Sequence, residues 1–314
     1  MLSRPVGRRP AALMLTLLLV TVAPSLAPQE PNSTPDPAAA QDRPPGTTLY
    51  AVALSDGRTL LVDAIDSGPA GGLTVVRQGT RQELDLASLA STQAKPRRFI
   101  LGTDHLGRDL LSRVLHGLRT SLGIALVATI LALTVGTLVG LVAAGAGGWL
   151  DELTMRIVDV LMAVPKLFLV LAIAATLGPS RGLLVTLLAA TTWMPIARIV
   201  RARTVTLRAA PFSTAARAIG CSPRRVLTHH YLPHLAGTLW TLGVLGVGNL
   251  ILLESALSFL GAGLPPPVAT LGGMVAEAAL QSTPSWWSIV FPGAAIVLPS
   301  LACAWVADQI TAVR

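Results

Sequence analysis

Long apolar stretches separated by short charged segments dominate the chain. Six of them approach or exceed the roughly 20 residues that a helix needs to cross a bilayer, and membrane helices tolerate the glycine and proline inside them. A soluble protein with unusually apolar helices is disfavoured by these lengths. We predict an all-α polytopic membrane protein with six transmembrane helices, at Ala11–Ala27, Ser121–Ala146, Ile157–Leu177, Leu183–Val200, Leu235–Leu260 and Ser288–Ile310.

Composition agrees with this pattern. Of the 314 residues, 52% are hydrophobic and only 13% are charged, which is more apolar surface than a soluble core of this size requires. The formal net charge of +8 comes from basic residues beside the apolar stretches. No basic groove with interleaved aromatic residues accompanies them, so no nucleic acid is expected as a partner. Cys221 and Cys303 are too few and too separated to indicate a disulfide framework.

The first apolar stretch fits two kinds of segment. Three arginines precede it and small residues, Ser25 and Ala27, close it, as in a cleavable signal sequence. Pro28 follows at the position where cleavage would occur, which favours a retained transmembrane helix over residues 1–27. Under either interpretation, the residues after Pro28 lie outside the cytoplasm.

Arginine distribution predicts the orientation. The segment 201–234 between the fourth and fifth stretches has no Asp or Glu, whereas Glu277 is the only charged residue in the loop 261–287. Because basic loops remain cytoplasmic, we expect segment 201–234 and both termini on the cytoplasmic side. The arginines concerned are Arg201, Arg203, Arg208, Arg217, Arg224 and Arg225.

Residues 28–98 then form an extracytoplasmic region. A linker rich in Pro, Ala and Ser extends to about Thr47, and a small β-rich insertion is predicted after it, although a disordered tether remains the alternative. The Asp56-Gly57 pair is typical of a hairpin turn. Apolar residues alternate on both sides of it, at Tyr50, Val52, Leu54, Leu60, Val62 and Ala64.

Segment 106–119 has apolar residues at helical spacing and a charged opposite face. This pattern suits an interfacial helix that lies on the membrane before the second span. A polar beginning of the membrane helix itself fits nearly as well.

The arginine-rich segment predicts two short helices. Pro211 suits a first helical turn, Gly220 suits the left-handed position after a helix, and Ser222-Pro223 suits an N-cap followed by proline. Pro233 is expected to end the second helix near Leu232. Such a unit could transmit force as one body or simply connect two spans, and the spacing alone leaves both open.

Several motifs resemble one family in the same order along the chain. AARAIG at 215–220 with Leu232-Pro233 looks like the cytoplasmic EAA loop of ABC importer permeases. The remaining motifs are similar to the C-type subunit of dipeptide, oligopeptide and nickel importers, and the resemblance covers roughly residues 99–310. They are LGTDHLGRDLLSRVLHGLRTSL at 101–122, ESALSFLGAGLPPPVATLGGMVAEA at 254–278, Trp286-Trp287 and Phe291-Pro292-Gly293.

The resemblance implies a type I ABC importer (MetI-like) permease domain over 99–314, in a bacterial-type cytoplasmic membrane. It implies that a coupling helix docks on a cytoplasmic ATPase. The family usually has Glu before the paired alanines, whereas this chain has Thr214, so that charge contact is expected to be missing or replaced by nearby arginines. The coupling residues carried over by position are Thr214, Ala215, Ala216, Arg217, Gly220, Leu232 and Pro233.

ATP hydrolysis by this chain is not expected. A P-loop requires Gly-Lys before Ser or Thr, but the only lysines, Lys95 and Lys166, follow Ala94 and Pro165. The resemblance therefore implies two separate ABC ATPase subunits that use ATP and Mg, a homologous second permease subunit and an extracytoplasmic solute-binding protein. No cofactor is expected in this chain itself.

Three polar residues are candidates for the translocation path. Lys166 lies deep in the third stretch, where a path role and an interfacial or ion-paired role are evenly matched. Asn249 and Glu254 could line the path, although helix packing is the favoured role. A catalytic site is not predicted. Histidines 229, 230 and 234 do not predict a metal site, because Pro233 interrupts their helix and a ligand shell is lacking.

The expected function is import of di- or oligopeptides by alternating access. Import of nickel or another small solute is the alternative within the family, and an ATPase-independent channel or transporter is the alternative outside it. Region 28–98 lies outside the resemblance, and we expect it to contact the binding protein.

Overall fold

The structure is a computed structural model that describes residues 23–67, 73–77, 79–84 and 94–312 of the chain. Its contacts divide the chain into two compact units. The helical unit contains residues 121–264 and those from 296 onwards, and the mixed unit contains residues 21–120 and 265–295. Most of the first predicted span lies outside the described residues, and its end is a short 3-10 helix, η1 (Ala23–Leu26).

Long apolar helices form the helical unit. Four helices are long and apolar enough to cross a membrane, or up to five if a bent pair counts as one span, within the described part of the chain. Four of the predicted spans thus correspond to helices, and the third corresponds to the bent pair. The helices are α3 (Leu110–Ala146), α4 (Gly148–Ala163), α5 (Lys166–Leu177), α6 (Arg181–Arg208), α9 (Leu232–Phe259) and α11 (Trp286–Ala312).

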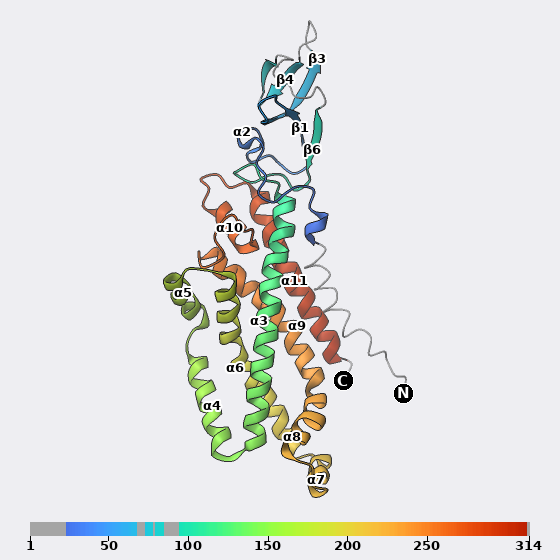
Figure 1. Ribbon diagram of the computed structural model, residues 1–314, viewed down its shortest axis with the longest axis vertical. Helices are drawn as coiled ribbons and strands as arrows, with labels where there is room; N and C mark the ends of the chain where they lie inside the picture. Colours follow the sequence, from blue (N-terminus) through green and yellow to red (C-terminus); the bar gives the residue numbers. More distant parts are fainter. Residues whose placement is uncertain (1–22, 68–72, 78, 85–93, 313–314) are drawn as a thin grey trace, which may run out of the picture. The chain divides into compact units, whose positions relative to one another are not determined.

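The prediction of one continuous third span was wrong. Helices α4 and α5 meet at a bend of 72° (Figure 1). Val164 between them has extended backbone angles, with φ −77° and ψ 123°. Proline has no amide hydrogen and disfavours a helical conformation in the residue before it, so Pro165 ends α4 after Ala163. Lys166 consequently begins a new helix.

The prediction of a separate interfacial helix over 106–119 was also wrong. Helix α3 begins at Leu110 and runs through 37 residues to Ala146, so its polar first turns are the beginning of the long helix. Asp109 stands just before this helix, and its Oδ2 accepts a hydrogen bond of 2.8 Å from the Ser112 amide. That contact satisfies an amide at the start of the helix that has no intrahelical partner.

Two glycines allow α3 and α6 to approach closely. A Cβ atom added at Gly136 would lie 2.6 Å from the Trp193 carbonyl oxygen, and one added at Gly140 would lie 2.5 Å from that of Ala197. The four-residue spacing places both glycines on one face of α3. Small residues at this spacing allow close helix packing in membranes.

Six strands form two antiparallel sheets in the mixed unit. One sheet has the order β2-β1-β6 and the other has the order β3-β4-β5 (Figure 1). Tyr50 pairs with Val62, and Gly57 between their strands has φ +84°, so a hairpin is present around Asp56-Gly57. The strands are β1 (Thr47–Ala53), β2 (Thr59–Val62), β3 (Ala64–Ser67), β4 (Leu73–Arg77), β5 (Thr80–Leu84) and β6 (Lys95–Phe99).

Apolar side chains of the first sheet pack on the short helix α2 (Pro37–Ala40). Leu49, Leu61 and Phe99 are each no more than 1% exposed in this cluster. Asp36 caps α2, and its carboxylate also accepts hydrogen bonds from the Leu61 amide and the Arg77 guanidinium. A single buried carboxylate thereby joins α2 to both sheets.

Candidate functional site

The arginine-rich segment folds into short helices at one end of α9 (Figure 1). Helix α7 (Pro211–Ala218) begins with proline, and Gly220 has φ +83°, the left-handed conformation that glycine adopts without strain. Ser222 caps α8 (Pro223–Arg225), where its Oγ accepts a bond from the Arg225 amide. All three local predictions are confirmed.

The predicted end of the second helix near Leu232 was wrong. Helix α8 continues through a π-helical turn, η4 (Val226–Tyr231), directly into α9. The Leu232 amide bonds to the Leu227 carbonyl five residues earlier. Pro233 thus falls in the first turn of α9, where a missing amide hydrogen is tolerated, and the widened turn accommodates the change of register.

Ser213 and Tyr231 join α7 to this π-helical turn. Ser213 Oγ and the Tyr231 hydroxyl share a hydrogen bond, and Arg217 Nη2 donates to the same hydroxyl at 3.0 Å. Ala216 and Val226 belong to the apolar cluster around the Tyr231 ring. These contacts support one side of α7 and leave the opposite side accessible.

The predicted coupling residues divide between these two sides. Ala216 is 6% exposed and packs inwards, whereas most of the others are exposed, together with Ile219, which is 81% exposed. Leu232 is 37% exposed and Pro233 is also exposed, so they are not covered by the α7 contact. The exposed members on the α7 side are Thr214, Ala215, Arg217 and Gly220.

Besides Arg217, which donates to Tyr231, two of the six arginines make contacts within the helical unit. Arg201 binds Asp151, and Arg208 Nη1 donates to the Ala144 carbonyl at 2.9 Å. Four others are exposed to solvent: Arg203, Arg217, Arg224 and Arg225. With no Asp or Glu between residues 201 and 234, the surface around α7 and α8 is basic.

The arginine-rich segment 201–234 lies within a region that matches a known protein family. Residues 136–313 match the model of the binding-protein-dependent transport system inner membrane component family. The chain belongs to this family. The match covers the end of α3 and every helix from α4 to α11 as far as residue 312, and it excludes the six strands. The chain is therefore an integral membrane permease component, and the arginine-rich segment lies in its family domain.

Curated proteins with similar sequences are named as permeases of peptide transport systems. A candidate peptide transport system permease protein of Brucella suis is 39% identical over 209 residues, which are 67% of this chain and 70% of that protein. A candidate peptide permease protein of the same organism is 36% identical over 228 residues, or 71% and 75% of the two chains. The dipeptide transport system permease protein DppC of Alkalihalophilus pseudofirmus is 37% identical over 209 residues, covering 66% and 68%.

The three translocation-path candidates have different environments in this permease. Lys166 is exposed and is the first residue of α5, and Asn249 is exposed on α9. Glu254 is fully buried, and its Oε1 accepts a bond of 2.7 Å from Ser258 while Ser121 provides another contact from α3. Because Asn249 and Glu254 differ in burial on one helix, α9 presents them on different faces.

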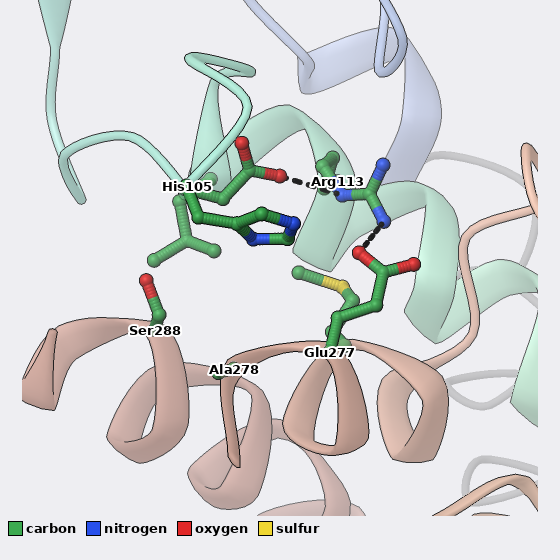
Figure 2. A pocket seen from close by; sticks show the side chains of 8 residues that line it. His105, Arg113, Glu277, Ala278 and Ser288 are labelled. Atoms are coloured by element: carbon green, nitrogen blue, oxygen red, sulfur yellow. Dashed lines mark hydrogen bonds and ion pairs between the residues drawn. The ribbon is translucent and has the colours of Figure 1, made fainter. Parts of the chain in front are cut away.

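A buried ionic cluster in the mixed unit was not predicted. Arg108 binds Asp104 through Nε and Glu277 through Nη2, each at 2.6 Å. Arg113, which is 2% exposed, lies 3.2 Å from Glu277 and 3.5 Å from Asp104. Figure 2 shows the Arg113 guanidinium reaching Glu277 of α10 (Leu271–Ala279) beside the His105 ring. The charged face of segment 106–119 contains Arg108 and Arg113, but they were not predicted to pair with Asp104 or Glu277.

This cluster does not have the donor chemistry of a cation site. Ligand atoms of Asp104, His105 and Glu277 lie within 4.8 Å of one another. Both carboxylates already accept bonds from Arg108, and Arg113 adds a second positive charge. Two guanidinium groups oppose a cation at the same oxygens. The geometry instead suits an ion-pair network that fixes α3 against α10.

Proposed function

We propose that this permease imports di- or oligopeptides across the cytoplasmic (inner) membrane by alternating access. It acts with a homologous second permease subunit, two ABC ATPase subunits and an extracytoplasmic solute-binding protein. ATP and Mg are bound by the ATPases. Support comes from the family match and from the peptide and dipeptide permeases to which the chain is similar.

The observation that carries the proposal is the supported, exposed face of α7. Thr214, Ala215 and Arg217 are exposed on one side of α7, whereas Ala216 on its other side is buried. A short helix that is packed on one side can transmit a displacement from a partner docked on its other side without deforming. Together with Gly220, Leu232 and Pro233, these residues form the proposed ATPase-coupling element.

Topology follows from the same proposal. The chain crosses the membrane six times, with residues 11–27 retained as the first helix and the bent α4–α5 pair as the third. The basic segment 201–234 and both termini face the cytoplasm, in agreement with the preference of arginine for that side.

The ATPase surface that receives α7 is proposed to be acidic. Arg203 of α6 and Arg224 and Arg225 of α8 are exposed on the helices before and after α7 in the chain, and Thr214 contributes no charge. Charge complementarity accelerates association and weakens with salt. Neutralising these three arginines is expected to increase the dissociation constant for the ATPase and to reduce its dependence on salt; unchanged salt dependence would contradict an acidic surface.

The six-stranded region is proposed to contact the solute-binding protein on the outer side. It precedes α3 and lies outside the matched family domain. Deletion of residues 48–90 is expected to weaken docking of the binding protein to the assembled complex. Unchanged docking would refute this role.

Transport in proteoliposomes tests the proposal. The complete complex is reconstituted with its binding protein, and uptake of isotope-labelled di- and tripeptides is compared with uptake of Ni²⁺. Uptake of peptides only when ATP and the ATPases are present supports the proposal. Peptide uptake that persists without the ATPase chains would exclude an ATP-driven permease, and uptake of Ni²⁺ alone would exclude a peptide permease.

A further inference from the structure

Tyr231 occupies the buried junction between α7 and the turn that leads to α9. Its side chain is 1% exposed, and its ring belongs to an apolar cluster with Ala216, Val226 and Leu235. Its hydroxyl reaches the beginning of α7 at Ser213. None of the sequence motifs singled out this tyrosine.

Of the two hydrogen bonds of this hydroxyl, the one with Arg217 has a donor that is fixed by chemistry. Arginine can only donate hydrogen bonds, so the phenol oxygen accepts from Arg217 Nη2. The phenol proton is then available for donation to Ser213 Oγ, which lies within hydrogen-bonding distance. Ser213 is 0% exposed. Tyr231 therefore holds α7 at its first turn and again at its last turn.

The backbone directs the tyrosine into this position. Tyr231 is the last residue of η4, whose π-helical turns contain more residues than α-helical turns. Directly after it, α9 begins at Leu232. A displacement of α7 can thus reach a membrane helix through one side chain, with no flexible segment between Tyr231 and α9.

We propose that Tyr231 is a positioning residue for energy coupling. Its hydrogen bonds to Ser213 and Arg217 make α7 and the start of α9 move together when a partner displaces α7. Without them, α7 can rotate about Gly220, and part of the displacement is lost before it reaches α9. This role rests on the proposed function, because it requires an ATPase that docks on α7.

The test measures peptide transported per ATP hydrolysed by the complete complex in proteoliposomes. Tyr231→Phe removes the hydroxyl and keeps the ring in the cluster, and Ser213→Ala removes the opposite partner. Thr134→Val is the matched control, because it removes an exposed hydroxyl that donates to the Ile130 carbonyl of the same helix. Complex yield and ATPase content are measured for each variant.

Tyr231→Phe removes both hydrogen bonds and is expected to lower the transport-to-hydrolysis ratio by at least about five-fold, the factor of one typical hydrogen bond, at normal complex yield. Ser213→Ala is expected to lower it similarly, which provides the test if the phenylalanine variant does not assemble. The double variant is expected to lose less than the product of the two single effects, because the two groups share one bond. Thr134→Val is expected to retain the wild-type ratio.

Two results would contradict the coupling role of Tyr231, and they can be told apart because only one of them also contradicts the proposed function. If wild-type transport depends on ATP and both single variants keep the wild-type ratio, the role of Tyr231 is refuted and the proposed function stands. If wild-type vesicles transport peptide equally without the ATPases, the proposed function fails and the coupling role fails with it.

Discussion

Arg201 of α6 and Asp151 of α4 are joined by two hydrogen bonds, of 2.7 Å from Nε and 2.8 Å from Nη2. The paired, parallel geometry is the strong form of an arginine–carboxylate contact. Asp151 is also in the first turn of α4, where a negative charge is favourable. This ion pair thus fixes the beginning of α4 to α6.

Asp151→Ala is expected to destabilise the purified permease by on the order of 2 kcal/mol, between the values for exposed and buried pairs. Thermal unfolding in detergent measures the effect. Glu152→Ala is the matched control, because its pair with Arg156 is largely exposed, with side chains 68% and 76% accessible. Equal losses in the two variants would contradict a special contribution from Asp151.

Gly140→Ala is expected to force α3 away from α6. The added Cβ would lie 2.5 Å from the Ala197 carbonyl oxygen, a backbone atom that cannot rotate aside. Overpacking of this kind costs about 1–3 kcal/mol, and a lower unfolding temperature is the expected readout. Gly123→Ala on the same helix has no atom within 4 Å of its new Cβ, and it is expected to be neutral or slightly stabilising. The reverse order of the two variants would contradict close α3–α6 packing.

Gly220→Val is expected to uncouple ATP hydrolysis from transport. The glycine has φ +83° and no atom within 4 Å of an added Cβ, so backbone strain rather than collision is the cause. A β-branched residue resists this conformation, whereas asparagine tolerates it. Gly220→Asn is therefore expected to retain most of the transport-to-hydrolysis ratio, and a normal ratio in Gly220→Val would exclude a requirement for the left-handed hinge.

Asp109 is expected to make stability depend on pH. Burial raises the pKa of its carboxyl group above the ordinary value, against the opposing hydrogen bonds from Ser112. A raised acid pKa contributes stability at low pH that is lost as pH rises through the folded-state pKa. Asp109→Asn keeps a capping oxygen without the charge, so its unfolding temperature relative to wild type is expected to increase as pH rises above about 4.

Asp56 provides a control of opposite sign for this measurement. Its hydrogen bonds with Arg58 lower the pKa of its carboxyl group on an exposed turn. The contribution of Asp56 is therefore present above the ordinary pKa and is lost as pH falls. For Asp56→Asn, the unfolding temperature relative to wild type is expected to increase as pH falls towards the folded-state pKa. A constant difference between wild type and Asp109→Asn across pH would contradict the proposed burial effect.

Local sequence signals were sufficient for the short helices of the arginine-rich segment 201–234. Pro211, Ser222 and Gly220 each specify a backbone conformation within a few residues, so the beginnings of α7 and α8 and the left-handed turn were predictable. Pro165 carried an equally local signal for the bend between α4 and α5, which the apolar length of the stretch concealed. Pro233 misled the prediction because the π-helical turn before it has no recognised local signature.

By itself, the sequence determined the membrane-spanning character of the chain and the positions of its local helix ends, because hydropathy and backbone preferences act over neighbouring residues. Tertiary structure alone decided the partners of its polar side chains. Arg113 meets Glu277 across 164 positions, and Ser213 meets Tyr231 through a turn whose width changes which residues face α7. Such contacts depend on where distant segments lie after packing, which no periodicity along the chain specifies.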